Sequence, residues 1–174
     1  YARVLQSHTA PITDLTFARD GQRLITSSQD QAVKLWDLAQ PPDPLTGKLA
    51  GQSALIALAP DGRWLATVNV AQAPQLWDTA TGQLSGTLNG AGHTETVRAV
   101  IFSRDGKWLA TGGADSSVRL WDVHARRLVT RLPQADAIEA LAFSANHQWL
   151  AIGSNDGSVK LWDVARNREL GSLK

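Results

Sequence analysis

The chain has 174 residues, with 17 Lys and Arg against 16 Asp and Glu, and it contains no cysteine. A formal net charge of +1 argues against a nucleic-acid partner or an anionic membrane surface. The lack of cysteine excludes disulfides, thiolate zinc sites and thiol catalysis, and it fits a cytoplasmic location. Methionine is also absent, even at position 1, so we expect the chain to be a segment of a longer protein.

One stretch of sequence occurs four times along the chain. Its most complete copy is VRAVIFSRDGKWLATGGADSSVRLWD, residues 97–122, and every copy ends in a Trp-Asp pair. The tryptophans of these pairs are separated by 41, 44 and 41 residues, and they are Trp36, Trp77, Trp121 and Trp162. Apolar and polar residues alternate within each copy, which is typical of β-strands. A repeat of ~40–45 residues built from strand-like runs predicts the blades of a β-propeller.

The first repeat predicts strands over residues 12–17, 24–28 and 33–36. Asp20-Gly21 separates the first two strands and predicts a hairpin, because both residues tolerate positive φ. The same signal recurs at Asp61-Gly62 and Asp105-Gly106, and Asn146-His147 replaces it in the fourth repeat. We expect outer strands over 45–49, 84–88, 128–132 and 170–173, and an exposed proline-rich connection over 40–44.

These repeats, with their closing Trp-Asp pairs, resemble the WD40 repeat family over nearly the whole chain. The resemblance implies an all-β fold, a WD40-type β-propeller region of four blades with four antiparallel strands each. Such a region is a partial propeller or half of an eight-bladed ring. The implied units are the outer strand of a preceding blade over residues 1–6 and blades at about 7–50, 51–90, 91–133 and 134–174. The leading strand implies either ring closure or a missing upstream blade.

The family also implies a buried hydrogen-bond chain in each complete blade. Its members are a His before the first strand, a hydroxyl on the second, an Asp in the next turn and the Trp of the third. By position, these residues are His8, Thr26, Asp30 and Trp36 in blade 1, and His93, Thr111, Asp115 and Trp121 in blade 3. Blade 2 keeps Thr67 and Trp77, and blade 4 keeps Asp156 and Trp162 with Ile152 and Gln134 at the other two positions. We expect blades 1 and 3 to anchor the array, and the joint replacement of several members to leave fewer orphaned polar groups than the deletion of one.

A His, a hydroxyl and a carboxylate are also the components of a nucleophilic triad. We favour the structural interpretation, because the set occurs twice at one repeat position and the sequence supplies no oxyanion site or substrate pocket.

We expect no cofactor and no metal site, since His124 and His147 have no second ligand at metal spacing. Trp64, Trp108 and Trp149 share one repeat position, and we interpret them as packing residues instead of an exposed aromatic row.

The resemblance implies a noncatalytic scaffold for protein–protein interaction, with the contact residues on loops at the His-bearing end of the blades. These residues are Thr9, Pro11, Gln29, Thr94, Thr96, Asp136 and Asn155. They are mostly small and uncharged, which favours a protein or peptide partner, with no nucleic acid and no membrane. The alternative is a regulatory or sensor segment of a larger signalling enzyme, a kinase or NTPase, with a bacterial source as one option. Self-association, or remaining blades of the longer chain, would close the ring.

Overall fold

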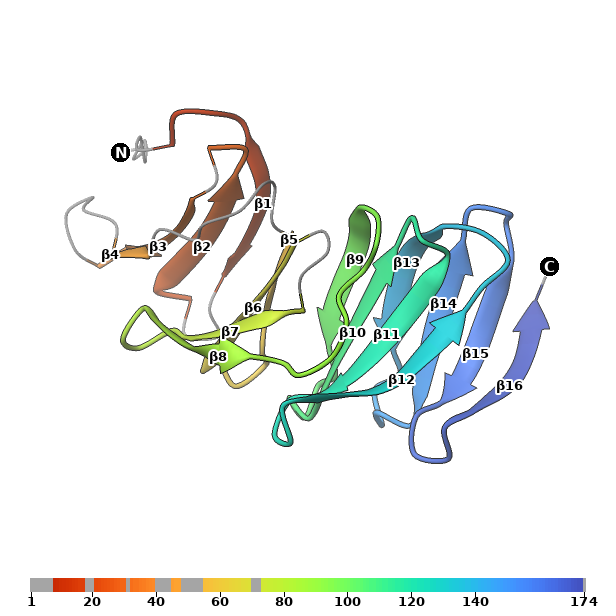
Figure 1. Ribbon diagram of the computed structural model, residues 1–174. Coiled ribbons are helices and arrows are strands. Elements are labelled where there is room, and N and C mark those ends of the chain that lie inside the picture. The colour runs from red at the N-terminus through yellow and green to blue at the C-terminus, as the bar shows by residue number, and fades with distance from the viewer. Residues whose placement is uncertain are drawn as a thin grey trace.

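A computed structural model describes residues 8–17, 21–30, 32–39, 45–47, 55–69 and 73–173, with only the backbone described for 45–47. These residues form four antiparallel sheets of four strands each. In every sheet the strands are hydrogen-bonded in chain order, so each sheet is a simple meander. Figure 1 shows the sheets following one another face to face from the N-terminal to the C-terminal side. The fold is therefore all-β and consists of propeller blades.

Each sheet takes four consecutive strands. The first sheet has β1 (Ile12–Phe17), β2 (Arg23–Ser28), β3 (Val33–Asp37) and β4 (Leu45–Gly47). The second has β5 (Leu55–Leu58), β6 (Trp64–Val68), β7 (Gln75–Asp78) and β8 (Gln83–Thr87). The third has β9 (Val97–Phe102), β10 (Trp108–Gly113), β11 (Ser117–Asp122) and β12 (Arg127–Pro133). The fourth has β13 (Ile138–Phe143), β14 (Trp149–Ser154), β15 (Val159–Asp163) and β16 (Arg168–Leu173).

The sequence predictions agree with these strands to within one or two residues wherever the structure describes them. The largest difference is at β16, which begins two residues earlier than the alternating apolar residues indicate. The predicted strand of the preceding blade over 1–6 and the proline-rich connection over 40–44 lie outside the described residues.

The turns between the first two strands of the second, third and fourth sheets differ from the expected hairpin geometry. Only their second residue has positive φ, with values of 74° and 71° at Gly62 and Gly106 and 60° at His147. The side chain of the first residue instead accepts a backbone N–H two residues later. Asp61 Oδ1 accepts from Arg63 N at 2.9 Å, and Asn146 Oδ1 accepts from Gln148 N at 3.2 Å. The Asp or Asn therefore acts through its side-chain oxygen.

Apolar layers fill the spaces between neighbouring sheets. Each layer takes buried residues from the facing sides of two consecutive sheets. Between the first and second sheets these are Ile25, Val33, Ile56 and Leu65. Between the second and third they are Ala59, Ala66, Leu76, Leu88, Phe102, Leu109, Trp121 and Val123. Between the third and fourth they are Ala110, Val118, Leu120, Leu132, Ile138, Leu150, Ile152 and Val164.

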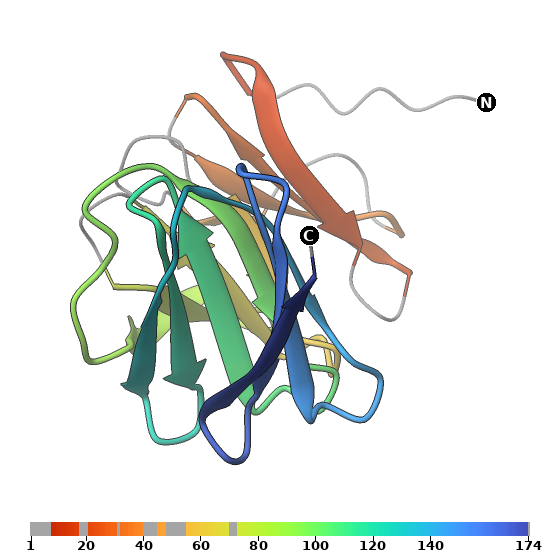
Figure 2. The same ribbon diagram turned by 90° about the vertical axis from the view of Figure 1, so that its right-hand side faces the viewer.

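The two outermost faces of the array have no such cover in the described chain. On the first sheet, Leu15 and Phe17 are 57% and 58% exposed, whereas Phe102, at the position of Phe17 in the third sheet, is buried. On the fourth sheet, Leu173 is 65% exposed, whereas Leu132 at the same repeat position is 3% exposed. Figure 2 shows the fourth sheet as the open end of the stack, with β16 toward the viewer.

At the tryptophan position that three repeats share, burial also depends on whether a neighbouring sheet is present. Trp64 and Trp108 are half-buried and pack against the layers between their own sheet and the next. Trp149 is 45% exposed, because no described sheet lies beyond the fourth. The packing interpretation therefore describes Trp64 and Trp108, and the exposure of Trp149 results from its place at the end of the array.

The close approach of the third and fourth sheets requires Gly112. A Cβ built at Gly112 would lie 2.5 Å from Ile138 Cγ2, whereas one at Gly153, the same repeat position, meets nothing closer than 3.5 Å. We predict that Gly112→Ala lowers the free energy of unfolding by about 1–3 kcal/mol, the usual cost of overpacking. Gly153→Ala is the control, since it makes the same change in backbone entropy without the clash. Equal urea midpoints for the two variants would contradict this description of the interface.

Candidate functional site

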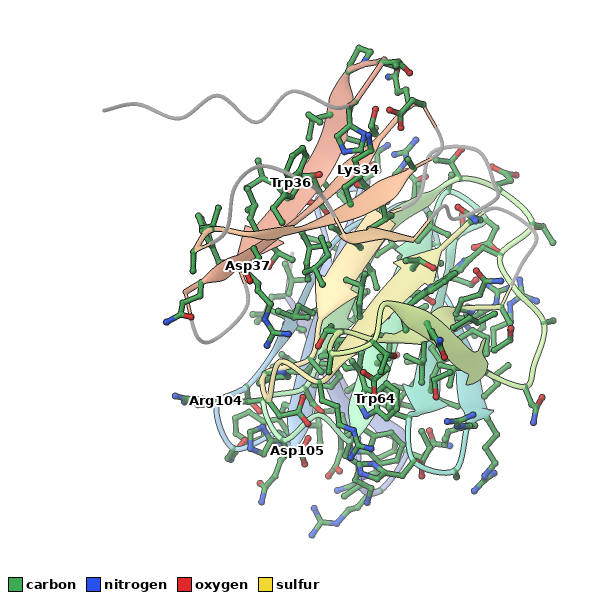
Figure 3. All side chains as sticks on the ribbon, turned by 90° about the vertical axis from the view of Figure 1, so that its left-hand side faces the viewer. Lys34, Trp36, Asp37, Trp64, Arg104 and Asp105 are labelled. Carbon is green, nitrogen blue, oxygen red and sulfur yellow. The ribbon has the colours of Figure 1, made fainter. Side chains whose placement is uncertain are left out.

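The first sheet contains one of the two predicted polar chains. His8 lies before β1, Thr26 on β2, Asp30 in the next turn and Trp36 on β3. His8 Nδ1 lies 2.9 Å from Asp30 Oδ2, and His8 Nε2 lies 2.8 Å from Thr26 Oγ1. The Trp36 indole N–H donates to the same hydroxyl at 2.9 Å. Figure 3 shows Trp36 within this sheet.

The third sheet repeats this arrangement with the same four residue types. His93 Nδ1 lies 2.9 Å from Asp115 Oδ1, and His93 Nε2 lies 2.8 Å from Thr111 Oγ1. The Trp121 indole N–H donates to Thr111 Oγ1 at 3.1 Å. The aspartates also fix the His-bearing loops, because Asp30 and Asp115 accept the backbone N–H groups of the residues after the histidines, Thr9 and Thr94.

In the third sheet a further donor, Arg119 Nη1, lies 2.6 Å from His93 Nδ1. In the first sheet the chemistry of the four groups alone fixes the direction of the chain. An ionised Asp only accepts, so the imidazole donates from Nδ1 and its Nε2 accepts. The threonine hydroxyl then donates to Nε2 and accepts from the indole. Every polar atom of the chain has a partner, which removes the cost of burying it between sheets.

A buried arginine extends the network in the third sheet. Arg119 is 2% exposed and donates to Asp115 Oδ2 at 3.0 Å, to Ser117 Oγ at 2.7 Å and to the carbonyl of Ala91 at 3.1 Å. Lys34, at the same repeat position in the first sheet, is also buried. The sequence analysis missed both residues. The repeated basic residue two positions before the Trp of the Trp-Asp pair was the signal that could have identified them.

This environment shifts the pKa values of the buried groups. Burial alone would raise the pKa of Asp30, but hydrogen bonds from Thr9 N, His8 and Ala32 N outweigh it and lower the pKa to about 2. Burial is likewise outweighed at Asp115, whose pKa is lowered by hydrogen bonds from His93, Ser117 and Thr94 N and from Arg119. Burial, then the positive charge of Arg119, lowers the pKa of His93 despite the opposing hydrogen bond with Asp115. We therefore assign a neutral His93 beside two ionised neighbours.

The second and fourth sheets hold partial sets. In the second sheet the Trp77 indole donates to Thr67 Oγ1 at 3.1 Å. In the fourth sheet Ile152 replaces the hydroxyl, and the buried atoms Trp162 Nε1 and Gln134 Oε1 have no hydrogen-bond partner in the described chain. The joint replacements leave these two orphaned polar atoms in this sheet. An isoleucine in the apolar layer adds burial but cannot accept from an indole.

The geometry of Thr111 does not suit a nucleophile. Thr111 is fully buried at 0% exposure, and its oxygen already accepts from the Trp121 indole. A substrate carbonyl cannot reach that oxygen without separating the sheets. Among the described residues there is also no group of three or more His, Asp or Glu side chains that could hold a metal ion.

The predicted contact residues lie at the end of each sheet that carries the His-bearing loop. Thr9, Pro11, Gln29, Thr94, Thr96 and Asn155 are exposed, and Asp136 is half-buried. Backbone hydrogen bonds join the two loops of the first, third and fourth sheets at this end, from Gln29 N to Pro11 O at 3.0 Å, from Ala114 N to Thr96 O at 2.8 Å and from Asn155 N to Ala137 O at 2.9 Å. Asn155 Nδ2 also donates to Asp136 Oδ2 at 3.2 Å. We call this end of the sheets the loop face.

The first prediction concerns Asp115. Its removal would leave Arg119 and His93 buried without their acceptor, so we expect Asp115→Ala to lower the free energy of unfolding by about 3–5 kcal/mol. The neighbouring Ser116→Ala should lower it clearly less, because the half-buried Ser116 side chain takes no part in this network and serine and alanine would adopt the same backbone conformation there. Urea denaturation measures both, and equal effects would contradict an anchoring role for this network.

A second prediction concerns pH. The pKa of His93 is lowered in the folded state, so the unfolded chain binds a proton more readily below the ordinary value of 6.5. The neutral His93 therefore contributes to the free energy of unfolding above pH 6.5, and this contribution is lost as the pH falls below that value. His93→Gln removes this contribution, and Gln134 occupies the corresponding position in the fourth sheet. We expect the urea midpoint of the variant to fall less between pH 7.5 and pH 5 than that of the wild type, whereas parallel curves would refute the assignment.

Known proteins share these repeats. The family model described as "WD domain, G-beta repeat" matches residues 1–37, 82–122 and 126–163. The COMPASS component SWD1 of Saccharomyces cerevisiae is 48% identical over 42 residues, which are 24% of this chain and 10% of that protein. The COMPASS component SWD3 of the same organism is 57% identical over 30 residues, 17% of this chain and 10% of that protein.

Each of these two relatives is thus matched over only a tenth of its length. Their matched lengths are those of about one repeat, and the family model covers more than half of the chain. The four sheets and the spacing of the Trp-Asp pairs agree with that match. The chain belongs to the WD40 repeat family.

Proposed function

We propose that the chain is a noncatalytic scaffold that binds a protein or peptide at its loop face. The observation that carries this proposal is the joining of both loops of a sheet at that face by backbone hydrogen bonds, while Asp30 and Asp115 hold the His-bearing loops. WD40 repeats in general serve protein interaction. A surface whose loops are already fixed loses little conformational freedom on binding, which favours affinity.

The chemistry of the loop face supports a protein partner. Its exposed residues are mainly hydroxyl, amide and proline side chains, and the chain as a whole has a net charge of only +1. A surface of this kind lacks the clustered positive charge that nucleic acid and anionic lipid attract. No helix in the described ranges has the length and apolar character of a membrane span. On the charge of this surface we propose partners other than nucleic acid or membrane, and we propose the cytoplasm as the location because it suits a chain without cysteine.

The relatives support a role within an assembly. Both are named as components of COMPASS, and under this proposal the present chain is likewise a component of a larger protein complex. These names give no support to the alternative of a regulatory segment in a kinase or NTPase. The buried position of Thr111 supports the noncatalytic part of the proposal.

We also propose that a further sheet of the same kind covers each open end of the array. Ile138 is fully buried against the third sheet, whereas Ile12 at the same repeat position of the first sheet is 46% exposed. Leu132 and Leu173 show the same contrast on the opposite face. The first sheet of a second copy could therefore pack against the fourth sheet in the way that the fourth sheet packs against the third within one chain. Two copies would form an eight-bladed ring, and additional repeats of a longer chain would fill the same role.

The loop face is tested by charge substitutions that leave the core intact. Thr96 and Asn155 are exposed and lie in neighbouring sheets, so Thr96→Arg with Asn155→Arg should change the surface without unfolding the protein. We expect proteins captured by the wild-type chain, identified by mass spectrometry, to fall at least tenfold with this double variant. Arg104→Glu is the control, because Arg104 is exposed at the opposite end of the third sheet, as Figure 3 shows. Capture that survives the double variant, or is lost with the control, would exclude the loop face.

A further inference from the structure

A pocket of about 170 Å³ opens between the second and third sheets, at the end opposite the loop face. The second sheet contributes Arg63 from the turn before β6, Trp64 from β6 and Leu76 from β7. The third contributes Val123, His124 and Arg126 from the turn between β11 and β12. Figure 3 shows Trp64 at this lower end of the second sheet. The pocket is therefore built by two repeats together.

The pocket combines an apolar floor with a cationic rim. Leu76 and Val123 are buried and Trp64 is half-buried, whereas Arg63, His124 and Arg126 are exposed. No lining residue is acidic, and none of the three rim residues forms an ion pair within the described part of the chain. The Arg63 guanidinium lies 4.8 Å from the centroid of the Trp64 ring, a cation–π contact that orients it along the pocket wall.

Arg126 is held in place across the gap between the sheets. Its Nη1 donates to Ser85 O at 2.9 Å and its Nη2 to Ser85 Oγ at 2.8 Å. A Cβ at residue 86 would lie 2.8 Å from Arg126 Nη1, so Gly86 leaves room for the guanidinium. Two of its five N–H donors are used in this way, and three remain for a ligand. A guanidinium fixed before binding loses little entropy when a ligand arrives.

The fold does not require these rim residues. The positions of Val123, His124 and Arg126 hold Val164, Ala165 and Asn167 in the fourth sheet, and Thr79, Ala80 and Gly82 in the second. The last position has positive φ in all three sheets, at 52°, 50° and 69° for Arg126, Asn167 and Gly82. Glycine and asparagine suit this conformation better than arginine. The crevice between the third and fourth sheets thus repeats the apolar floor with Trp108, Leu120 and Val164, whereas it lacks the histidine and arginine.

We propose that this pocket binds an oxyanion carried on an apolar or aromatic side chain of a peptide. The cationic rim complements a carboxylate or phosphate, and the floor of Trp64, Leu76 and Val123 accepts the attached group. The volume is well below the roughly 300 Å³ at which pockets begin to hold drug-sized ligands, so one side chain fits it. The site is separate from the loop face, and either can exist without the other.

NMR titration of the chain with phenyl phosphate tests the proposal. We expect saturable shifts of the Trp64 indole and His124 resonances at millimolar concentration, weaker at high salt because exposed charges are screened. Phenylacetate tests a carboxylate in place of the phosphate, and inorganic phosphate tests the anion without its ring. Benzyl alcohol, which has the ring without the charge, should bind at least tenfold more weakly than phenyl phosphate. No saturable shift with either aryl anion would overturn the proposal.

Matched variants locate the site. Arg126→Asn introduces the residue that the fourth sheet carries at the same positive-φ position, so the turn should fold, and we expect phenyl phosphate affinity to fall at least tenfold. Arg63→Gln should act in the same direction. Lys107→Gln is the control, because Lys107 lies 4.9 Å from the ring centroid of Trp108 at the same repeat position, in the crevice without the histidine and arginine. An equal loss of affinity with Lys107→Gln would show nonspecific attraction to positive charge and would overturn the proposal.

Discussion

A four-stranded sheet with apolar residues on both faces is stable in water only when a neighbour covers each face. Three apolar layers meet this requirement inside the array, and the contrast between Leu132 and Leu173 shows what happens where cover ends. Each repeat therefore depends on its neighbours for stability, as in other repeat proteins. The same dependence creates crevices between sheets that no single repeat could form.

The buried polar networks act within a sheet, whereas the apolar layers act between sheets. The chain from Trp121 through Thr111 and His93 to Asp115 fixes the positions of β10, β11 and the His-bearing loop of the third sheet relative to one another. The aspartate at its end also holds the loop that we propose as a contact surface. Under that proposal, stability and binding are coupled through the same carboxylate, since loosening it would free the loop. The Trp162 indole has no hydrogen-bond partner in the described chain, so polar contacts constrain the fourth sheet less than the third.

Much of the fold could be predicted from the sequence, because the information is local and repeated. Spacing of the Trp-Asp pairs, alternation of apolar residues and Asp-Gly turns each specify a strand or its end. The burial of Arg119 was missed, because a charged residue in a strand normally indicates a solvent-facing position. The pocket at Arg126 could not be predicted either, since it forms only where Ser85 and Gly86 of one repeat meet the turn of the next. The exposure of Trp149 depends on whether another sheet packs beyond the fourth, and the local sequence around Trp149 does not indicate this.

The central claim is that each sheet face must be covered by a neighbouring sheet. Light scattering of the chain at micromolar concentration tests this claim most directly. With Leu15 and Phe17 exposed at one end and Leu173 at the other, the account predicts a mass above that of one chain, or binding of a dye that reports apolar surface. Leu173→Asp should then return the mass to one chain by placing a charge in the contact. A single-chain mass without dye binding would contradict the account, because it would mean that the end faces need no cover.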